Sequence, residues 1–354
     1  MKQCAKRLAL EAATLAVGGL GGWFFSLLAV PLPWLLGPLV TVGGLSLAGF
    51  SLSTPWGCRQ AGQVLVGTGI GLKFTLAVAL FVADHLMIMV LCALTSVALG
   101  AAASILLRRA TDADIATAYF ACVPGGVAEM SVQAERHGGE SGPVALAQAL
   151  RVLCVVTTVP IGLTWAGVTS DPLFDIPEFA FDATGFGPLL IIALSSGALL
   201  AWRRVANAWM LGPMAAAATL TASDITLSGM PIVLLNVAQV MLGCTLGLRY
   251  RRAAIERLKS FLMPLAVSTI ALVGLNILLG VVVGLFTSLP ISSMILSLAP
   301  GGMPEMAITA KVLDLAVPLV VAFHIVRIFI VVAISGLVFR HAVQHETKRD
   351  PPVD

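Results

Sequence analysis

Long uninterrupted apolar runs are the feature that most restricts how this chain can fold. Residues 85–107 (HLMIMVLCALTSVALGAAASILL) and 261–286 (FLMPLAVSTIALVGLNILLGVVVGLF) are longer than the roughly 18 to 20 apolar residues that cross a bilayer as a helix. Since 58% of the chain is hydrophobic and only 11% is charged, most of it belongs in lipid or in a helical core. A membrane β-barrel would need short strands of alternating polarity, which these runs lack. The sequence therefore predicts an all-α polytopic membrane protein.

The chain also contains an internal duplication. Four blocks recur in the same order and at a nearly constant offset: PWLLGP (33–38) with AWMLGP (208–213), QVLVGTGIGLKF (63–74) with QVMLGCTLGLRY (239–250), PGGVAEM (124–130) with PGGMPEM (300–306), and QALRVLCVV (148–156) with HIVRIFIVV (324–332). Chance similarity between apolar segments would not keep such polar residues in register. We therefore divide the chain into a first membrane repeat (1–170), an acidic external linker (171–185), a second membrane repeat (186–340) and a polar cytoplasmic tail (341–354).

The positions of basic residues predict how the repeats are oriented, because basic loops stay in the cytoplasm. Basic residues occur near the N-terminus, at 108–109, at 203–204, at 249–259 and after 340, whereas 171–182 contains four acidic residues and no Lys or Arg. With both termini inside and the linker outside, each repeat crosses the membrane an odd number of times. The repeats are then inverted, as in many secondary transporters. We expect a multi-pass protein of the bacterial inner membrane.

Five crossings per repeat fit these charges. They cover 8–30, 34–52, 60–82, 85–107 and 143–168, and then 186–202, 208–222, 231–248, 261–286 and 316–339. Each repeat has one further apolar stretch, which contains the PGG phrase, at 113–137 in the first repeat and 290–313 in the second. If these stretches crossed the membrane fully, basic loops would lie outside. We therefore expect two re-entrant or broken-helix hairpins, the first entering from the cytoplasm and the second from outside. A twelve-helix arrangement is the alternative.

Two PGG phrases interrupt apolar segments, and they comprise Pro124, Gly125 and Gly126 in the first repeat and Pro300, Gly301 and Gly302 in the second. Backbone groups freed by such a break are tolerated at membrane depth only where they are buried or line a watery cavity. A helix that restarts after the second Gly would point its positive N-terminal end into that cavity. Such an end suits an anion or a substrate carboxylate.

Glu129 and Glu305 each follow the second Gly of a phrase by three residues. This spacing suits a carboxylate that caps the restarted helix. A proton or cation site at the tip of each hairpin is the second interpretation, because a charge inside a bilayer costs at least about 2.5 to 3.5 kcal/mol and needs a reason. Inverted repeats favour this site, since the two tips would converge near the midplane.

Arg151 and Arg327 follow Glu129 and Glu305 at the same distance in each repeat, within apolar helices. Ion pairs with these carboxylates and binding of a substrate anion are equal alternatives for the two guanidinium groups. Close by, Gln148 of the first repeat is replaced by His324 in the second. For His324 the interpretations are a hydrogen-bonded helix contact and a proton relay.

Gln63 and Gln239 begin matching runs in which glycines recur four residues apart, at 67 and 71 and at 243 and 247. Small residues at this spacing predict close packing of helices. Asn236 and Gln239 share a helical face, so they could also contribute to a cavity.

The sequence predicts no catalytic residues, no metal site and no cofactor. A copper or iron oxygenase needs clustered imidazole or carboxylate ligands, yet the chain has only five His, and the pair at helical spacing, His341 and His345, lies in the tail. The six cysteines are scattered, mostly in apolar runs, and are expected to be buried small hydrophobes. A net charge of +3 is too small and too dispersed for a nucleic-acid partner.

The paired LGP, Q-V-x-x-G and PGG-x-x-E-M motifs resemble those of the AbrB-type duplicated bacterial membrane protein family, over residues 8–340. The resemblance implies a two-repeat membrane fold. Labels in that family include ammonia monooxygenase and AbrB family regulator, and the name is shared with an unrelated small soluble regulator. The residues support neither metal-dependent oxidation nor direct DNA binding, while an indirect effect on gene expression stays open.

Together these features predict a secondary transporter of a small polar or anionic solute, coupled to protons or cations and working by alternating access. Its partners would be the solute or ion and the lipid bilayer, and homo-oligomerisation stays open. The alternative is a membrane sensor or regulatory protein on a transporter-like fold. We favour the transporter because we find no output domain in the sequence.

Overall fold

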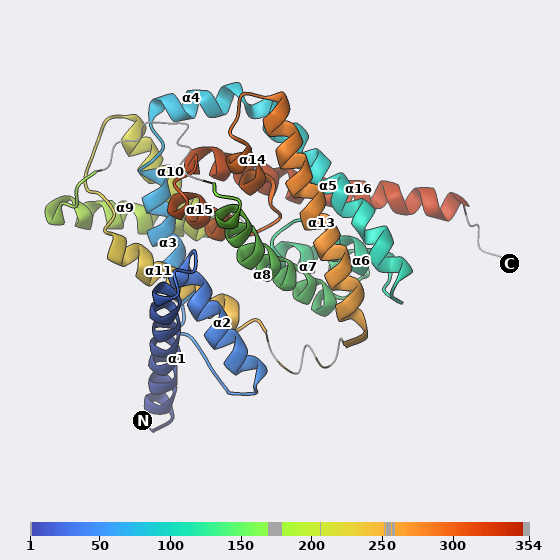
Figure 1. Cartoon of the computed structure of the whole chain (residues 1–354), viewed down its shortest axis with the longest axis horizontal. Helices are drawn as coiled ribbons and strands as arrows, with labels where there is room; N and C mark the ends of the chain where they lie inside the picture. Colours follow the sequence, from blue (N-terminus) through green and yellow to red (C-terminus); the bar gives the residue numbers. More distant parts are fainter. Residues whose placement is uncertain are drawn as a thin grey trace. The chain divides into compact units, whose positions relative to one another are not determined.

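The computed structural model describes residues 2–168, 179–205, 207–250, 252, 256 and 259–349, with side chains at all of these except 2–6, 128, 259–260 and 341–349. These residues form helices and no β-strand, which confirms the all-α class (Figure 1). The helices are α1 (Lys2–Leu27), α2 (Pro33–Leu47), α3 (Cys58–Gly71), α4 (Leu76–Asp84), α5 (Leu86–Arg109), α6 (Ile115–Cys122), α7 (Val127–Arg136), α8 (Ser141–Trp165), α9 (Ala183–Trp202), α10 (Ala208–Ala222), α11 (Ile232–Gly247), α13 (Lys259–Phe286), α14 (Ile291–Leu298), α15 (Met303–Val312) and α16 (Val317–Arg349).

Six of the described helices are long and apolar enough to cross a membrane, namely α1, α5, α8, α9, α13 and α16. Each coincides with one of the crossings predicted above, so the membrane class is supported by helix length as well as by composition. The last of them, α16, continues to Arg349 and therefore includes the first part of the predicted polar tail. The count of ten crossings stays a prediction.

The predicted crossing at 60–82 is wrong as a single span. The chain turns between Gly71 and Leu76, so that α3 and α4 are bent by 92°. The turn is closed by hydrogen bonds from the Lys73 and Phe74 amides to the carbonyls of Ile70 and Gly71, and no Pro marks it in the sequence. Helices α2, α10 and α11 are also short: their 15, 15 and 16 residues reach only about 22 to 24 Å, against a hydrocarbon core of about 30 Å.

The duplication seen in the sequence extends to the bounds of the helices. Helix α10 has the same length as α2, and α14 and α15 have the same lengths as α6 and α7. The start and end of each are displaced along the chain by the offset that separates the matching sequence blocks, and α16 begins at this offset from α8. Matching sequence blocks have therefore folded into matching elements.

The chain forms two compact units, and neither unit is one of the sequence repeats. The first unit contains residues 1–84, 157–254 and 304–318, and the second contains 85–156, 255–303 and 319–354. The first unit thus combines α1–α4 with α9–α11, and the second combines α5–α7 with α13 and α14. Each unit takes corresponding helices from both halves of the sequence.

Glycines bring two pairs of helices in the first unit into backbone contact. A Cβ atom added to Gly67 of α3 would lie 2.5 Å from the carbonyl oxygen of Met210 in α10. A Cβ atom added to Gly243 of α11 would lie 2.5 Å from the carbonyl oxygen of Leu35 in α2. The two contacts are equivalent under the duplication, because Gly243 matches Gly67 and Met210 matches Leu35. The expected close packing through small residues is present in both pairs.

The core of the second unit contains both aromatic contacts and a buried polar hydrogen bond. Tyr119 and Phe120 of α6 pack their rings against Phe339 of α16, with centroids 5.4 and 5.3 Å apart. Helices α5 and α13 are joined by a buried hydrogen bond, in which the Ser96 hydroxyl donates to Oδ1 of Asn276 at 2.8 Å. Such a bond between apolar helices satisfies polar groups that lipid would leave unpaired.

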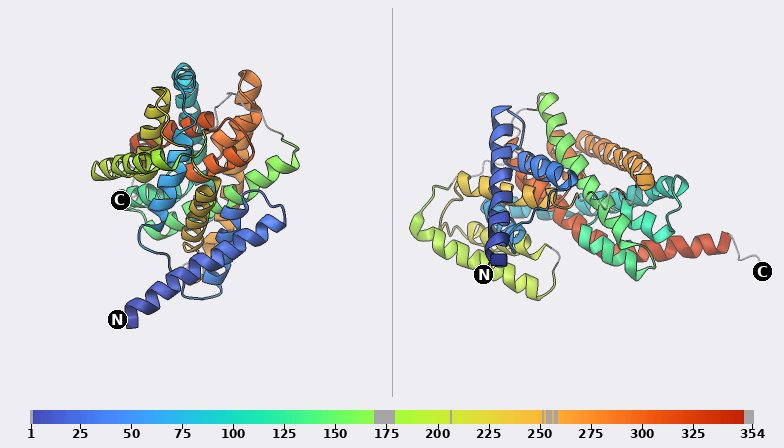
Figure 2. Two further views of the ribbon diagram at one scale, coloured as in Figure 1. Left: turned by 90° about the vertical axis from the view of Figure 1, so that its left-hand side faces the viewer. Right: turned by 90° about the horizontal axis from the view of Figure 1, so that it is seen from below.

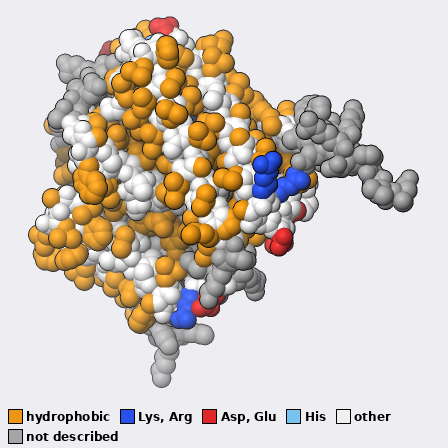
Figure 3. Space-filling model, turned by 45° about the vertical axis from the view of Figure 1, so that its right-hand side comes forward, with side chains coloured by type: hydrophobic (Ala, Val, Ile, Leu, Met, Phe, Trp, Pro, Cys, Tyr) orange, Lys and Arg blue, Asp and Glu red, His pale blue; other side chains and the backbone are white. Residues whose placement is uncertain are grey.

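Many large apolar side chains of the described residues are exposed. The face shown in Figure 3 is covered mainly by hydrophobic and uncharged side chains, with charged groups in a few places. On α9 only 17% of the candidate span is buried within the protein, and large side chains such as Ile191 and Leu199 are exposed. Exposed apolar area of this extent is what a lipid environment accommodates.

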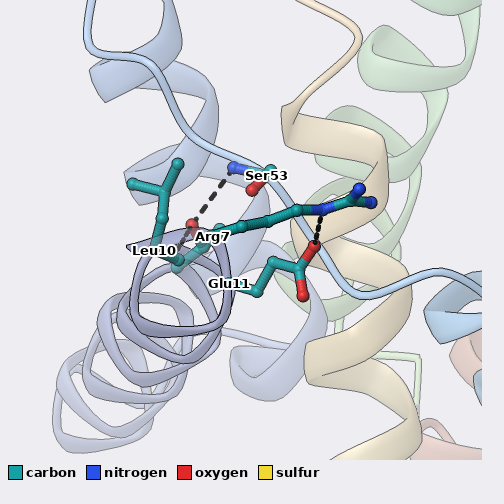
Figure 4. A network of polar contacts seen from close by, with 5 residues as sticks. Arg7, Leu10, Glu11 and Ser53 are labelled. Carbon is teal, nitrogen blue, oxygen red and sulfur yellow. Dashed lines mark hydrogen bonds and ion pairs between the residues drawn. The ribbon is translucent and has the colours of Figure 1, made fainter. Parts of the chain in front are cut away.

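Helix α1, which is straight in both views of Figure 2, carries an ion pair near its N-terminal end. Arg7 Nε donates to Oε1 of Glu11 at 2.9 Å (Figure 4). One turn later, Thr14 Oγ1 accepts a hydrogen bond from the Ser53 amide at 3.3 Å and ties α1 to the segment that precedes α3. The ion pair itself contributes little stability, because 70% of the Arg7 side chain is exposed.

Asp182 caps the beginning of α9. Its carboxylate accepts hydrogen bonds from the amides of Thr184 and Gly185 at 3.1 and 3.2 Å, and the Thr184 hydroxyl donates to it as well. These bonds, led by the one from the Thr184 side chain, lower the pKa of Asp182. The other acidic residues of the predicted linker, at 171–178, lie outside the described residues.

Candidate functional site

Both PGG phrases break helices at equivalent positions. Helix α6 ends at Cys122 and α7 begins at Val127, while α14 ends at Leu298 and α15 begins at Met303. The residue before each proline is extended, as proline requires of its predecessor: Val123 has φ −60° and ψ 128°, and Ala299 has φ −53° and ψ 129°. The predicted breaks are therefore confirmed, and each leaves backbone carbonyls without helical partners.

Arg151, from α8, supplies donors to the first break. Its Nη1 donates to the Val123 carbonyl at 3.3 Å and its Nη2 to the Gly125 carbonyl at 3.1 Å. The side chain is buried, and its Nε donates to the Pro300 carbonyl of the second break at 2.8 Å. One guanidinium group therefore binds both PGG phrases, and this contact lies entirely within the second unit.

Arg327, from α16, repeats this arrangement at the second break. Its Nη1 donates to the Ala299 carbonyl at 2.8 Å and its Nη2 to the Gly301 carbonyl at 2.9 Å. Ala299 and Gly301 are the duplicated counterparts of Val123 and Gly125. The same donor thus binds the same two carbonyls in each half, next to the negative C-terminal end of a short helix.

Ion pairs with the glutamates were one of two alternatives for the arginines, and they do not form between the described residues. Within the part of the chain that the structure describes, neither Arg151 nor Arg327 forms an ion pair with Glu129 or Glu305. The guanidinium groups bind carbonyl oxygens instead, because a break after α6 or α14 leaves several acceptors within reach of one planar donor. Arg327 Nε is buried and has no hydrogen-bond partner among the described residues.

Gln148 is a member of this network that the predicted site did not include. Its Nε2 donates to the carbonyls of Phe120 and Val123 at 2.8 and 2.9 Å, and its Oε1 accepts from Arg151 Nη2 at 2.6 Å. The signal was present in the sequence, since Gln148 occupies the position that His324 takes in the second half. An amide there both donates and accepts, which lets it bridge the arginine and the carbonyls.

His324 makes a different contact from Gln148. Its Nδ1 lies 2.9 Å from the Val320 carbonyl of its own helix, which assigns the ring hydrogen to Nδ1. The side chain is fully buried, and Nε2 has no hydrogen-bond partner among the described residues. The hydrogen-bonded helix contact is therefore present, and the role as a proton relay stays a prediction.

The two glutamates occupy unequal surroundings. The Glu129 carboxylate is half-buried and folds back over Gly126, where an added Cβ atom would collide with Oε2. Glu305 is only 6% exposed, and its Oε2 has no partner among the described residues. In the first unit, Arg59 and Arg249 are near enough to act electrostatically on Glu305. A buried carboxylate oxygen without a donor is the kind of group that marks a binding or proton-transfer site in a membrane.

A partly enclosed pocket lies in the first unit. Its volume is about 160 Å³, and it is bounded by the start of α2, the middle of α3, and parts of α11 and α15. The polar residues that line it are Asn236, Gln239 and Lys311, so Asn236 and Gln239 do contribute to a cavity. Gln63 is buried on α3 but does not line this pocket.

No group of three His, Cys, Asp or Glu side chains that could hold a metal ion occurs within the described ranges. Four of the cysteines, Cys58, Cys92, Cys122 and Cys244, are buried, as expected of small hydrophobes. They lie on α3, α5, α6 and α11, among apolar side chains.

Comparison with known proteins identifies a family and two relatives that match most of the chain. A family model described as "Transition state regulatory protein AbrB" matches residues 34–342. An "Uncharacterized protein YhjN" of Bacillus subtilis (strain 168) is 25% identical, over 94% of each chain. A "Putative regulator AbrB" of Escherichia coli (strain K12) is 27% identical, over 91% of this chain and 94% of that protein. No solved structure matches the chain.

Proposed function

The chain belongs to the AbrB family, and from this premise we propose that it is a secondary transporter of a small polar or anionic solute in the bacterial inner membrane. Transport would be coupled to a proton or another cation and would proceed by alternating access rather than by catalysis. Both termini would be cytoplasmic. Glu129 and Glu305, at the starts of α7 and α15, would carry the coupling ion.

One observation carries this proposal: the two helix breaks are held together by Arg151. Unwound backbone at membrane depth is tolerated where it is buried in protein or lines a cavity, and paired broken helices are a feature of transporter sites. Here the Arg151 guanidinium donates to Gly125 in one break and to Pro300 in the other. An apolar helical protein without a solute to handle would have little reason to duplicate such a costly arrangement.

A membrane sensor or regulator is the second candidate function, and the name of the Escherichia coli relative favours it. A sensor would bind a ligand without moving it across the bilayer. Reconstituted protein therefore separates the two functions, because only a transporter gives net solute flux.

The coupling role of the glutamates is testable in liposomes with a panel of solutes and imposed proton or sodium gradients. Glu305→Gln keeps the size of the buried side chain but removes its charge, and we expect it to lower gradient-driven flux at least about tenfold, with a similar loss for Glu129→Gln. The matched control is Glu135→Gln, on the exposed side of α7, which should leave flux unchanged. If both Glu129→Gln and Glu305→Gln keep full flux, the coupling role is wrong.

The inverted orientation of the repeats is part of the proposal and has its own test. A cysteine introduced at Asp182, which is exposed before α9, should react with an impermeant maleimide added from outside. A cysteine at Ala110, exposed after α5, should react only when the reagent reaches the cytoplasmic side. Both variants need a background in which the six native cysteines are replaced. Labelling of position 182 from the cytoplasm alone would exclude inverted repeats.

A further inference from the structure

The pocket in the first unit contains amide groups that the protein leaves unpaired. Gln239 is 6% exposed and faces the pocket, yet its side chain has no hydrogen bond to another described residue. Asn236, one turn earlier on α11, is half-buried and is likewise without a partner within the described ranges. The two amides therefore offer donors and acceptors to whatever occupies the pocket, which points to a ligand with a polar head group.

The remaining walls of the pocket are apolar. Trp34 and Pro33 bound it on α2, Ile70 on α3 and Ile308 on α15. The volume of about 160 Å³ is close to that of an engineered cavity of about 150 Å³ that holds benzene. A ligand of roughly six non-hydrogen atoms with an apolar body therefore fits the space.

Charge restricts the class of ligand further. Lys311 of α15 is the charged residue among those that line the pocket, and the amide NH₂ groups of Asn236 and Gln239 add neutral donors beside it. In the first half of the sequence the position that matches Lys311 is Glu135, so the positive charge belongs to this half alone. A cation with neighbouring amide donors favours an anionic head group.

We propose that this pocket binds a short-chain carboxylate of about four carbons, with its head group at Asn236, Gln239 and Lys311 and its chain against Trp34 and Ile308. This inference rests on the proposed function, because it takes the bound carboxylate to be the solute that the protein transports. A volume of about 160 Å³ has room for a branched or linear C4 chain.

The test is equilibrium binding of radiolabelled butyrate to the full chain in nanodiscs, where no gradient or flux is needed. We expect saturable binding, and we expect Gln239→Met to weaken it at least about tenfold, because a similar volume is kept while the head-group donor is lost. Lys311→Met should weaken butyrate binding to a similar degree. The affinity for butyramide, the neutral analogue of the same shape, measured by competition, should change little. Gln60→Leu, on α3 and outside the pocket lining, is the matched control and should bind as wild type.

Several outcomes would overturn the pocket assignment. The first is the absence of saturable butyrate binding, and the second is normal butyrate binding by both Gln239→Met and Lys311→Met. The third is a Lys311→Met variant in which butyramide binding is weakened as much as butyrate binding. An unchanged thermal unfolding temperature without ligand shows that a variant is folded. If Gln239→Met does not fold, Asn236→Leu gives a second test of the head-group site. Binding without flux into liposomes would support the pocket and overturn transport. Flux of another solute without butyrate binding would overturn the pocket and leave transport standing.

Discussion

Replacing Arg151 with Met is expected to lower the free energy of unfolding by about 3 to 5 kcal/mol, the cost typical of removing one partner from a buried charged interaction. The substitution keeps most of the side-chain volume but removes the guanidinium donors to Val123, Gly125 and Pro300, although Gln148 Nε2 still donates to the Val123 carbonyl. The Gly125 and Pro300 carbonyls would lose the donor that Arg151 supplies. Thermal unfolding in detergent, followed with the yield of monodisperse protein, measures the effect.

Arg327→Met should be milder, at about 2 to 3 kcal/mol, because Arg327 binds only two described carbonyls and both lie in one break. Arg151→Lys should fall between wild type and Arg151→Met, since an ammonium keeps the charge but cannot match the planar geometry of three acceptors. Arg136→Met, at the exposed end of α7, is the control and should unfold as wild type does. Equal stability of Arg151→Met and Arg136→Met would show that the guanidinium contacts do not hold the breaks.

Substitution of Gly67 with Leu is the second change expected to have a large effect, of roughly 3 kcal/mol or more. Its new Cβ atom would lie 2.5 Å from the Met210 carbonyl oxygen, so two helix backbones rather than a side chain would have to separate. Gly243→Leu should be equally severe, because the same contact recurs against Leu35. Thermal unfolding and the fraction of protein that elutes as a single species measure both.

Gly44→Leu is the matched control, on α2 in the same unit, because nothing lies within 4 Å of a Cβ atom there. This variant should be neutral or slightly stabilising, since a helical glycine is replaced by a better helix former. A normal unfolding temperature for Gly67→Leu or Gly243→Leu would contradict the close approach of these helix pairs. A large difference between those two variants would contradict their equivalence.

The breaks at the PGG phrases could be predicted from sequence because their causes are local. Pro124 and Pro300 lack a backbone N–H and restrict the preceding residue, and the glycines that follow do not favour a helix. The same pattern occurs in both halves, and α6, α7, α14 and α15 lie within the two predicted hairpin ranges, 113–137 and 290–313. Apolar length likewise identified the six candidate spans.

The bend between α3 and α4 could not be predicted in this way. The run QVLVGTGIGLKF looks like one continuous apolar helix, and no proline marks the 92° turn after Gly71. Gly71 is where α3 touches the backbone of α10, near Met214, so packing between helices accompanies this turn. Packing of that kind depends on residues far apart in the sequence.

The partners of Arg151 separate what the sequence determines from what only the tertiary structure determines. The sequence by itself determined that an arginine follows each break at a fixed distance, because both positions recur at the offset of the duplication within apolar runs. It could not decide between carboxylate and carbonyl partners, since both lie within reach of a long, flexible side chain. Only the tertiary structure selects the carbonyls of Val123, Gly125 and Pro300 as partners. Packing α8 against both breaks places these three acceptors around one planar donor.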